Sequence, residues 1–104
     1  MNKAPRIIRR ETVYDGDRWI IPGTQDTYLL RCWHPAGDAH TYGALYFVHG
    51  RYGRPQLVRK WYAGMIADEI KWRIRKRRIR LIYRPLKERR KGCPLALLWH
   101  EGEV

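Results

Sequence analysis

The fold is decided by residues 27–49, which read TYLLRCWHPAGDAHTYGALYFVH. Its two outer segments, Thr27–His34 and Thr41–His49, are rich in Tyr, Leu, Trp, Phe and Val, residue types that favour strands. Between them, residues 35–38 (PAGD) supply the proline, glycine and aspartate that are typical of a turn. This stretch therefore predicts an antiparallel pair of strands.

A second pair of strands is predicted on the N-terminal side. The segments ETVY and RWII flank Asp15-Gly16-Asp17, and an Asp-Gly dipeptide tolerates the positive φ angles of a tight hairpin turn. Pro22 and Gly23 then close the second of these strands. We therefore expect a four-strand N-terminal meander, preceded by a flexible basic arm over residues 1–10 (MNKAPRIIRR) that becomes the first strand near Ile7.

One long amphipathic basic helix is predicted after the turn at residues 50–55 (GRYGRP). Pro55 suits a first helical turn, where its missing N–H has no helical partner. At about 100° per residue, an apolar stripe covers one side of such a helix. The stripe consists of Leu57, Val58, Trp61, Tyr62, Met65 and Ile66. Beyond Gly64 no glycine or proline occurs before Pro85, so the sequence leaves the end of the helix open.

Two C-terminal strands complete the expected fold. From Arg78 the period changes to two, with arginines (78, 80 and 84) on one face and apolar residues (79, 81 and 83) on the other. Residues 94–99 (PLALLW) indicate a buried final strand. The sequence thus predicts a single compact α+β domain over residues 1–104, with an antiparallel sheet and the helix packed on one face.

Positive charge is concentrated in the second half of the chain. Residues 1–53 hold seven Lys/Arg against five Asp/Glu, a net +2, whereas residues 54–104 hold fifteen against five, a net +10. Between Lys71 and Lys91, twelve basic residues face Glu88 alone. A protein that is basic only for solubility would spread this excess, so the asymmetry favours a surface that binds a polyanion.

The basic stretch is the predicted nucleic-acid-binding site. Arginines outnumber lysines there by eight to four, and guanidinium groups both grip phosphates and stack on bases. The candidate binding residues are Lys71, Arg73, Arg75, Lys76, Arg77, Arg78, Arg80, Arg84, Arg89, Arg90 and Lys91, together with Tyr52 in the glycine-rich turn. Among them, Arg73, Lys76, Arg77, Arg80 and Arg84 are expected to contact phosphates, with Arg89–Lys91 as a second contact.

Aromatic residues on the predicted strands have two interpretations. They could stack on the bases of a single strand, or they could fill the core between the sheet and the helix, which is the commoner use. The residues concerned are Trp19, Tyr28, Trp33, Tyr42, Tyr46 and Phe47.

Catalysis is an alternative, carried by the loop His49–Arg54. There His49 or Tyr52 would move a proton, and Arg51 or Arg54 would stabilise negative charge at phosphorus, as in a metal-independent endoribonuclease toxin. The absence of serine excludes Ser-His-Asp catalysis, and no glycine-rich phosphate cradle is present. The sequence therefore leaves enzymatic activity uncertain and favours a binding protein.

No cofactor and no metal are expected. Two cysteine–histidine pairs, Cys32 with His34 and Cys93 with His100, have spacings that fit neither common zinc pattern, so ordinary free thiols in a reducing cytoplasm are the better interpretation. Residues 1–10 lack the apolar stretch of a signal peptide, and no apolar run is long enough to cross a bilayer.

The leading interpretation is a small cytoplasmic protein that binds nucleic acid, DNA or RNA, without a membrane partner. A compact, basic, single-domain chain without enzymatic motifs would suit a regulator or accessory factor of a phage, plasmid or other mobile element. The second alternative is an inhibitor whose basic face docks on an acidic host protein.

Overall fold

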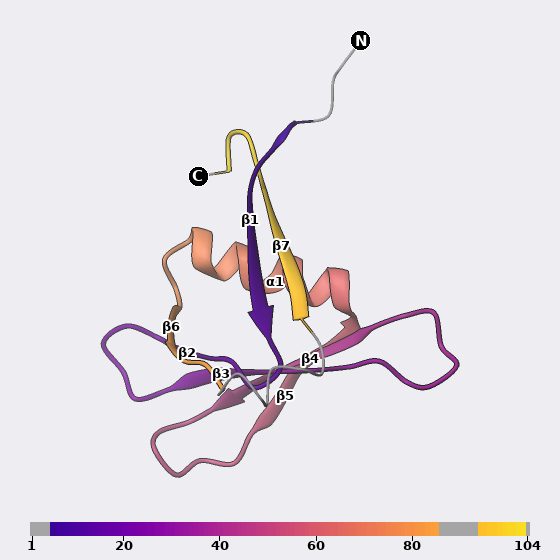
Figure 1. The fold of residues 1–104 in the computed structure, drawn as a ribbon. Coiled ribbons are helices and arrows are strands. Elements are labelled where there is room, and N and C mark those ends of the chain that lie inside the picture. The colour runs from indigo at the N-terminus through magenta and orange to yellow at the C-terminus, as the bar shows by residue number, and fades with distance from the viewer. Residues whose placement is uncertain (1–4, 86–93, 104) are drawn as a thin grey trace.

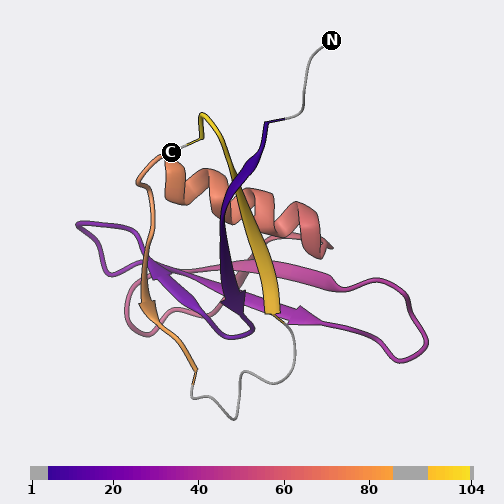
Figure 2. The ribbon, with the colours of Figure 1, turned by 45° about the horizontal axis from the view of Figure 1, so that its top comes forward.

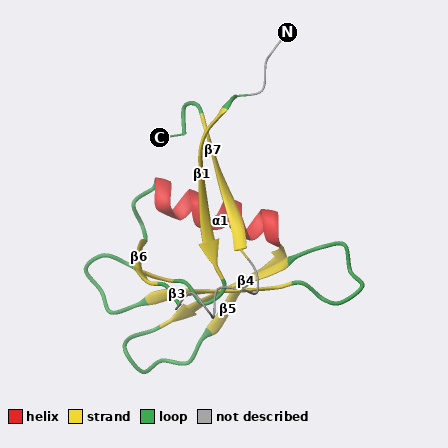
Figure 3. Cartoon of the chain, in the orientation of Figure 1, coloured by secondary structure: helices red, strands yellow, loops and turns green. Residues whose placement is uncertain are grey.

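The computed structural model describes residues 5–85 and 94–103. Within these residues, seven strands and one helix form in the order β1 (Ile7–Tyr14), β2 (Arg18–Ile20), β3 (Thr27–Trp33), β4 (Tyr42–Val48), β5 (Gln56–Tyr62), α1 (Ala63–Arg75), β6 (Arg80–Tyr83) and β7 (Pro94–His100). The predicted α+β class, the antiparallel pairing and the single domain are confirmed, and Figure 3 shows that strands dominate the described chain.

The strands form two antiparallel sheets. The larger has five strands in the order β5-β4-β3-β2-β6, and the smaller is a ribbon of β1 and β7. Figures 1 and 2 show that α1 and the β1–β7 ribbon lie on the same side of the five-stranded sheet. The opposite face of this sheet is covered by none of the described elements.

The core lies between the five-stranded sheet, the helix and the ribbon. On α1, Ile66 and Ile70 are buried one turn apart, as expected for an amphipathic helix. On β7, Leu95 and Leu97 are buried while the intervening Ala96 is exposed, so this strand alternates with a period of two. These side chains join Val13, Trp19, Leu30 and Leu45 in one apolar cluster.

The predicted pairing of the first two strands is wrong. The Asp-Gly turn exists, with Gly16 at a φ of 90° and the Asp17 N–H donating to the Tyr14 carbonyl, but its other backbone hydrogen bonds go to β3. The Gly16 N–H donates to the Leu30 carbonyl at 2.7 Å, and the Leu30 N–H donates to the Asp17 carbonyl at 3.0 Å. Strand β1 instead pairs with β7, so the four-strand meander that does form consists of β2–β5.

The predicted start of the helix is also wrong. Residues 56–62 form β5, which pairs with β4 and thereby satisfies backbone groups that would otherwise lie on an open sheet edge. The chain is still extended at Tyr62, and the Ala63 N–H donates to the Thr41 carbonyl before the helix begins. The helix is therefore 13 residues long rather than the long element that its apolar stripe predicted.

The alternating arginine face predicted for residues 78–84 forms only in part. A strand is present, but the register between β6 and β2 shifts at Arg18 and Trp19 because Ile82 is inserted as a bulge. Leu81 and Tyr83 are exposed, whereas Ile79 is buried. The sequence placed these three residues on one apolar face, but only Ile79 of the three is buried.

Candidate nucleic-acid interface

The predicted basic stretch divides into cations with internal partners and cations that are free to bind a ligand. Lys71, Arg73, Arg75 and Arg84 form ion pairs within the protein, and Lys76, Arg77, Arg78 and Arg80 are exposed. Arg89, Arg90 and Lys91 lie outside the described residues.

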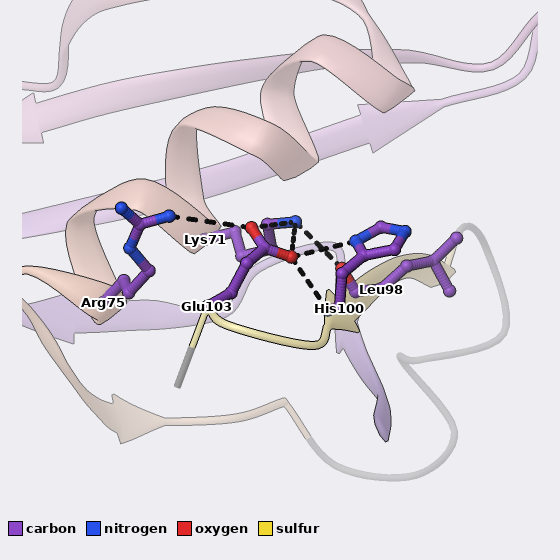
Figure 4. A network of polar contacts seen from close by, with 5 residues as sticks. All are labelled: Lys71, Arg75, Leu98, His100 and Glu103. Atoms are coloured by element: carbon purple, nitrogen blue, oxygen red, sulfur yellow. Dashed lines mark hydrogen bonds and ion pairs between the residues drawn. The ribbon is translucent and has the colours of Figure 1, made fainter. Parts of the chain in front are cut away.

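Lys71 ties the helix to the C-terminal end of the described chain (Figure 4). Its ammonium donates to the Leu98 carbonyl at 2.9 Å and to Glu103 at 3.0 Å, and its side chain is only 13% exposed. Glu103 also accepts the His100 backbone N–H at 2.8 Å and lies 3.7 Å from Arg75. The hydrogen bond from Lys71 and that from His100 lower the pKa of Glu103 to about 2. Lys71 thus serves the fold.

Arg73 is held in a similar way on the helix. One guanidinium nitrogen donates to the Tyr28 hydroxyl at 3.1 Å, and another donates to Glu69 at 3.0 Å. The guanidinium also lies over the Tyr28 ring, 4.6 Å from its centroid. The Arg73 side chain is only 16% exposed and is fixed by these contacts. It can therefore line a binding site, but it cannot move to reach a phosphate.

Arg84 neutralises a fully buried carboxylate. Its guanidinium donates to Asp17 at 2.9 Å, and Asp17 also accepts the Tyr14 N–H at 2.9 Å. The hydrogen bond to Asp17 raises the pKa of Arg84. Because an unpaired charge at this depth would be costly, the pair identifies Arg84 as a structural residue.

Four exposed cations follow directly on the end of α1, and we call them the basic corner: Lys76, Arg77, Arg78 and Arg80. None of them forms an ion pair with a carboxylate of residues 5–85 or 94–103. The Arg78 guanidinium lies 5.0 Å from the centroid of the Trp72 ring, which holds it against the helix.

The backbone of the basic corner is fixed by the way in which the helix ends. The Arg77 N–H donates to the Ile74 carbonyl and the Arg78 N–H donates to the Arg73 carbonyl, the two hydrogen bonds of a Schellman motif. Such a motif needs a left-handed residue, normally glycine, and here Arg77 adopts it with a φ of 55°. The turn places Arg77 and Arg78 beside one hollow, at the expense of backbone strain at Arg77.

A hollow of about 430 Å³ opens beside the basic corner. It is lined by Ile21, Pro22, Tyr28, Arg73, Arg77 and Arg78. Among the described residues, three guanidinium groups and no carboxylate border it, so it has the charge and the hydrogen-bond donors that a phosphate requires.

The predicted aromatic residues separate onto the two faces of the sheet. Trp19 is buried in the core, and Tyr28 and Phe47 contact each other on the side of α1, with ring centroids 5.6 Å apart. Trp33 and Tyr42 stack on the opposite, open face. The core interpretation is therefore correct for Trp19, and Trp33 and Tyr42 are placed where a ligand can reach them.

Known proteins offer no guide to this arrangement. No family model matches the chain, and no curated protein or solved structure matches it either. In the described part of the chain, no helix is long and apolar enough to cross a membrane.

Two further rings, Tyr62 and His40, lie beside Trp33 and Tyr42 and were not predicted from the sequence. Tyr62 stacks on Tyr42, and the His40 ring lies 5.0 Å from the Tyr62 ring. The sequence pattern places Tyr62 in a helix, so it gives no sign that this ring lies on the sheet. The alternation of Lys60 and Tyr62, read as a strand, would have placed both on one face.

The loop of the ribonuclease hypothesis forms the β4–β5 turn. His49 Nδ1 lies 3.0 Å from an Asp26 carboxylate oxygen that also accepts the Gly50 N–H at 2.8 Å. Tyr52 is 90% exposed, and Arg51 and Arg54 are exposed as well. Within the described residues no side-chain hydrogen bond or ion pair joins these three to His49.

The histidines and the described cysteine do not gather into a metal site. Cys32 is buried on β3, and Cys93 lies outside the described residues. The His34 ring lies 3.0 Å from the Thr41 hydroxyl, and the His100 ring lies 2.9 Å from Glu103. In residues 5–85 and 94–103, no group of three His, Cys, Asp or Glu side chains is arranged to hold a metal ion.

Proposed function

We propose that this protein binds nucleic acid through the basic corner, as a small regulator or accessory factor of a phage, plasmid or other mobile element. The observation that carries the proposal is the helix end at Arg77. A left-handed arginine costs energy where glycine would cost little, and it presents two guanidinium groups to a hollow that none of the described carboxylates borders.

Electrostatics supports the same proposal. Four like charges within five residues, at positions 76–80, repel one another, and a polyanion would relieve this repulsion. The charges stand at the C-terminal end of α1, where the helix dipole partly compensates for them. Arginine dominates the basic corner, and its planar fork suits phosphate oxygens better than an ammonium group does.

The first test is the salt dependence of binding. Affinity for single-stranded DNA, duplex DNA and RNA is measured by fluorescence anisotropy over a salt series. If the four cations of the basic corner each contact one phosphate, the logarithm of the affinity falls against the logarithm of salt concentration with a slope of about −3 to −4. A slope near zero, or no binding at low salt, overturns the proposal.

The second test locates the site with two variants of equal net charge. Arg77→Glu/Arg78→Glu should lose at least about 100-fold in affinity and reduce the salt slope by about 2. Arg51→Glu/Arg54→Glu changes the charge by the same amount on the exposed β4–β5 turn and should lose much less. Equal losses in both variants would mean that net charge alone, rather than the basic corner, determines binding. Circular dichroism verifies that both variants are folded.

The ribonuclease and inhibitor hypotheses stay predictions, because no contact among residues 5–85 and 94–103 favours either. RNA cleavage that is abolished by His49→Ala would support the ribonuclease. Capture of a host protein that survives nuclease treatment would support the inhibitor.

A further inference from the structure

The face of the five-stranded sheet that points away from α1 carries a second candidate binding surface. A Cβ on Gly43 would lie 3.0 Å from the Ile66 side chain, so Gly43 and its partner Cys32 face the helix. The neighbouring residues in each strand therefore face the other way. We call this surface the open face: Arg18, Arg31, Trp33, Tyr42, Lys60 and Tyr62.

Three aromatic rings from adjacent strands form a row on the open face. Trp33 of β3 and Tyr42 of β4 have ring centroids 6.2 Å apart and planes 24° from parallel. Tyr42 and Tyr62 of β5 are 5.5 Å apart and 27° from parallel. Tyr62 is 45% exposed, and it borders a hollow of about 310 Å³ that is otherwise lined by Tyr42, Lys60 and Trp61.

The middle ring is held in place by the β3–β4 loop. The Tyr42 hydroxyl donates to Asp38 at 2.8 Å, and Asp38 also accepts the His40 backbone N–H at 2.8 Å. The hydrogen bond to Asp38 raises the pKa of Tyr42, because it favours the protonated hydroxyl. The row is thus ordered before any ligand binds, which reduces the entropy lost on binding.

Cations accompany the rings across the sheet. In the register, Arg31 of β3 and Lys60 of β5 lie on either side of the small Ala44 of β4. The Lys60 ammonium lies 5.5 Å from the centroid of the Trp33 ring. Arg18 of β2 shares another hollow with Arg31. Of the described carboxylates only Asp15 lines it, and Asp15 pairs with Arg31 at 3.2 Å. The open face therefore combines apolar rings with net positive charge.

We infer that the open face binds single-stranded nucleic acid, with unpaired bases stacked on the Tyr62 end of the aromatic row and phosphates beside Lys60 and Arg31. The inference rests on the proposed function and specifies the ligand. Stacking needs bases whose faces are free, and a duplex keeps its bases stacked on one another. A sheet face with aromatic side chains and adjacent cations is the combination that single strands bind.

The experiment compares two substitutions of the same kind at opposite ends of the β4–β5 pair. Tyr62→Leu removes a ring from the open face, and Tyr52→Leu removes an exposed ring from the turn. Binding is measured to oligothymidylate, to oligouridylate, to a duplex and to an abasic strand of the same length. Tyr62→Leu should weaken binding to the two single strands by about tenfold or more and leave the abasic strand unchanged, because only stacking is lost. Tyr52→Leu should weaken binding to the two single strands much less, because its ring lies in the β4–β5 turn, at the other end of the strand pair from Tyr62.

A conservative variant separates stacking from folding. Tyr62→Trp keeps an aromatic face and should retain the affinity for single strands, whereas a purely structural role would make this larger side chain as harmful as leucine. Equal losses for the abasic strand and oligothymidylate, or a loss in Tyr52→Leu instead, overturn the inference. In either case, salt-dependent binding by the unmodified protein would leave the proposed function intact. If the unmodified protein binds none of the four ligands, both proposals fail.

Discussion

At the scale of single residues, Arg84 shows that a basic residue in the sequence need not be available to a ligand, because its charge is neutralised by Asp17. Arg84→Met should lower the free energy of unfolding by about 2–4 kcal/mol, because Asp17 would be left charged and fully buried. Arg84 itself is 31% exposed, which places the loss below that of a wholly buried pair. Urea denaturation followed by tryptophan fluorescence measures the change.

The double variant Asp17→Asn/Arg84→Met provides the control for this prediction. It removes the buried charge together with its partner, so it should be more stable than Arg84→Met alone. If the double variant is no more stable than the single one, the buried charge is not the cause of the loss.

At the scale of elements, Arg77 at the end of α1 affects both the stability of the fold and the affinity for nucleic acid. Arg77→Gly should raise the free energy of unfolding by about 0.5–1 kcal/mol, because glycine adopts a φ of 55° without the steric cost that arginine incurs. The same change should weaken nucleic-acid binding, because one cation of the basic corner is lost. Thermal unfolding and the anisotropy titration measure the two effects.

Arg78→Gly is the matched control for the helix end. It removes the same side chain and charge from the next residue, but Arg77 is the only non-glycine residue with a positive φ in the described part of the chain. Arg78→Gly should therefore weaken binding without gaining stability. If both variants gained a similar amount of stability, strain at Arg77 would not be the cause of the gain.

The sequence predicted those elements whose signals are local. The β3–β4 pair was found because both strands and their turn lie within residues 27–49. Strand β7 was found from its apolar run, but its pairing with β1 was not, because Val13 and Leu95 are far apart in the chain. Residues 57–62 have an apolar pattern that suits a helix. They form a strand because they pair with β4, whose edge would otherwise be unpaired.

At the scale of the whole molecule, the sequence predicted where positive charge is concentrated, but not which of the cations lack an ion-pair partner in the described part of the chain. Lys71 bonds to Glu103, 32 residues away, and Arg84 bonds to Asp17, 67 residues away. No local pattern shows which basic residues find such partners. The Schellman turn at Arg77 was equally hidden, because the glycine that normally signals it is missing.

The contacts of Glu103 join the β1–β7 ribbon to α1 and predict how acid loosens the molecule. Its pKa falls from 4.5 to about 2 because Lys71 and the His100 N–H donate to the carboxylate. Since the folded pKa is the lower one, the carboxylate stabilises the fold above about pH 4.5, and this contribution is lost as the pH falls toward 2. Urea midpoints between pH 5 and pH 2 should therefore decline less in Glu103→Gln than in the unmodified protein. Lys71→Met should show most of the same flattening, because it removes the largest cause of the shift, and parallel profiles in all three proteins would contradict the role of this contact.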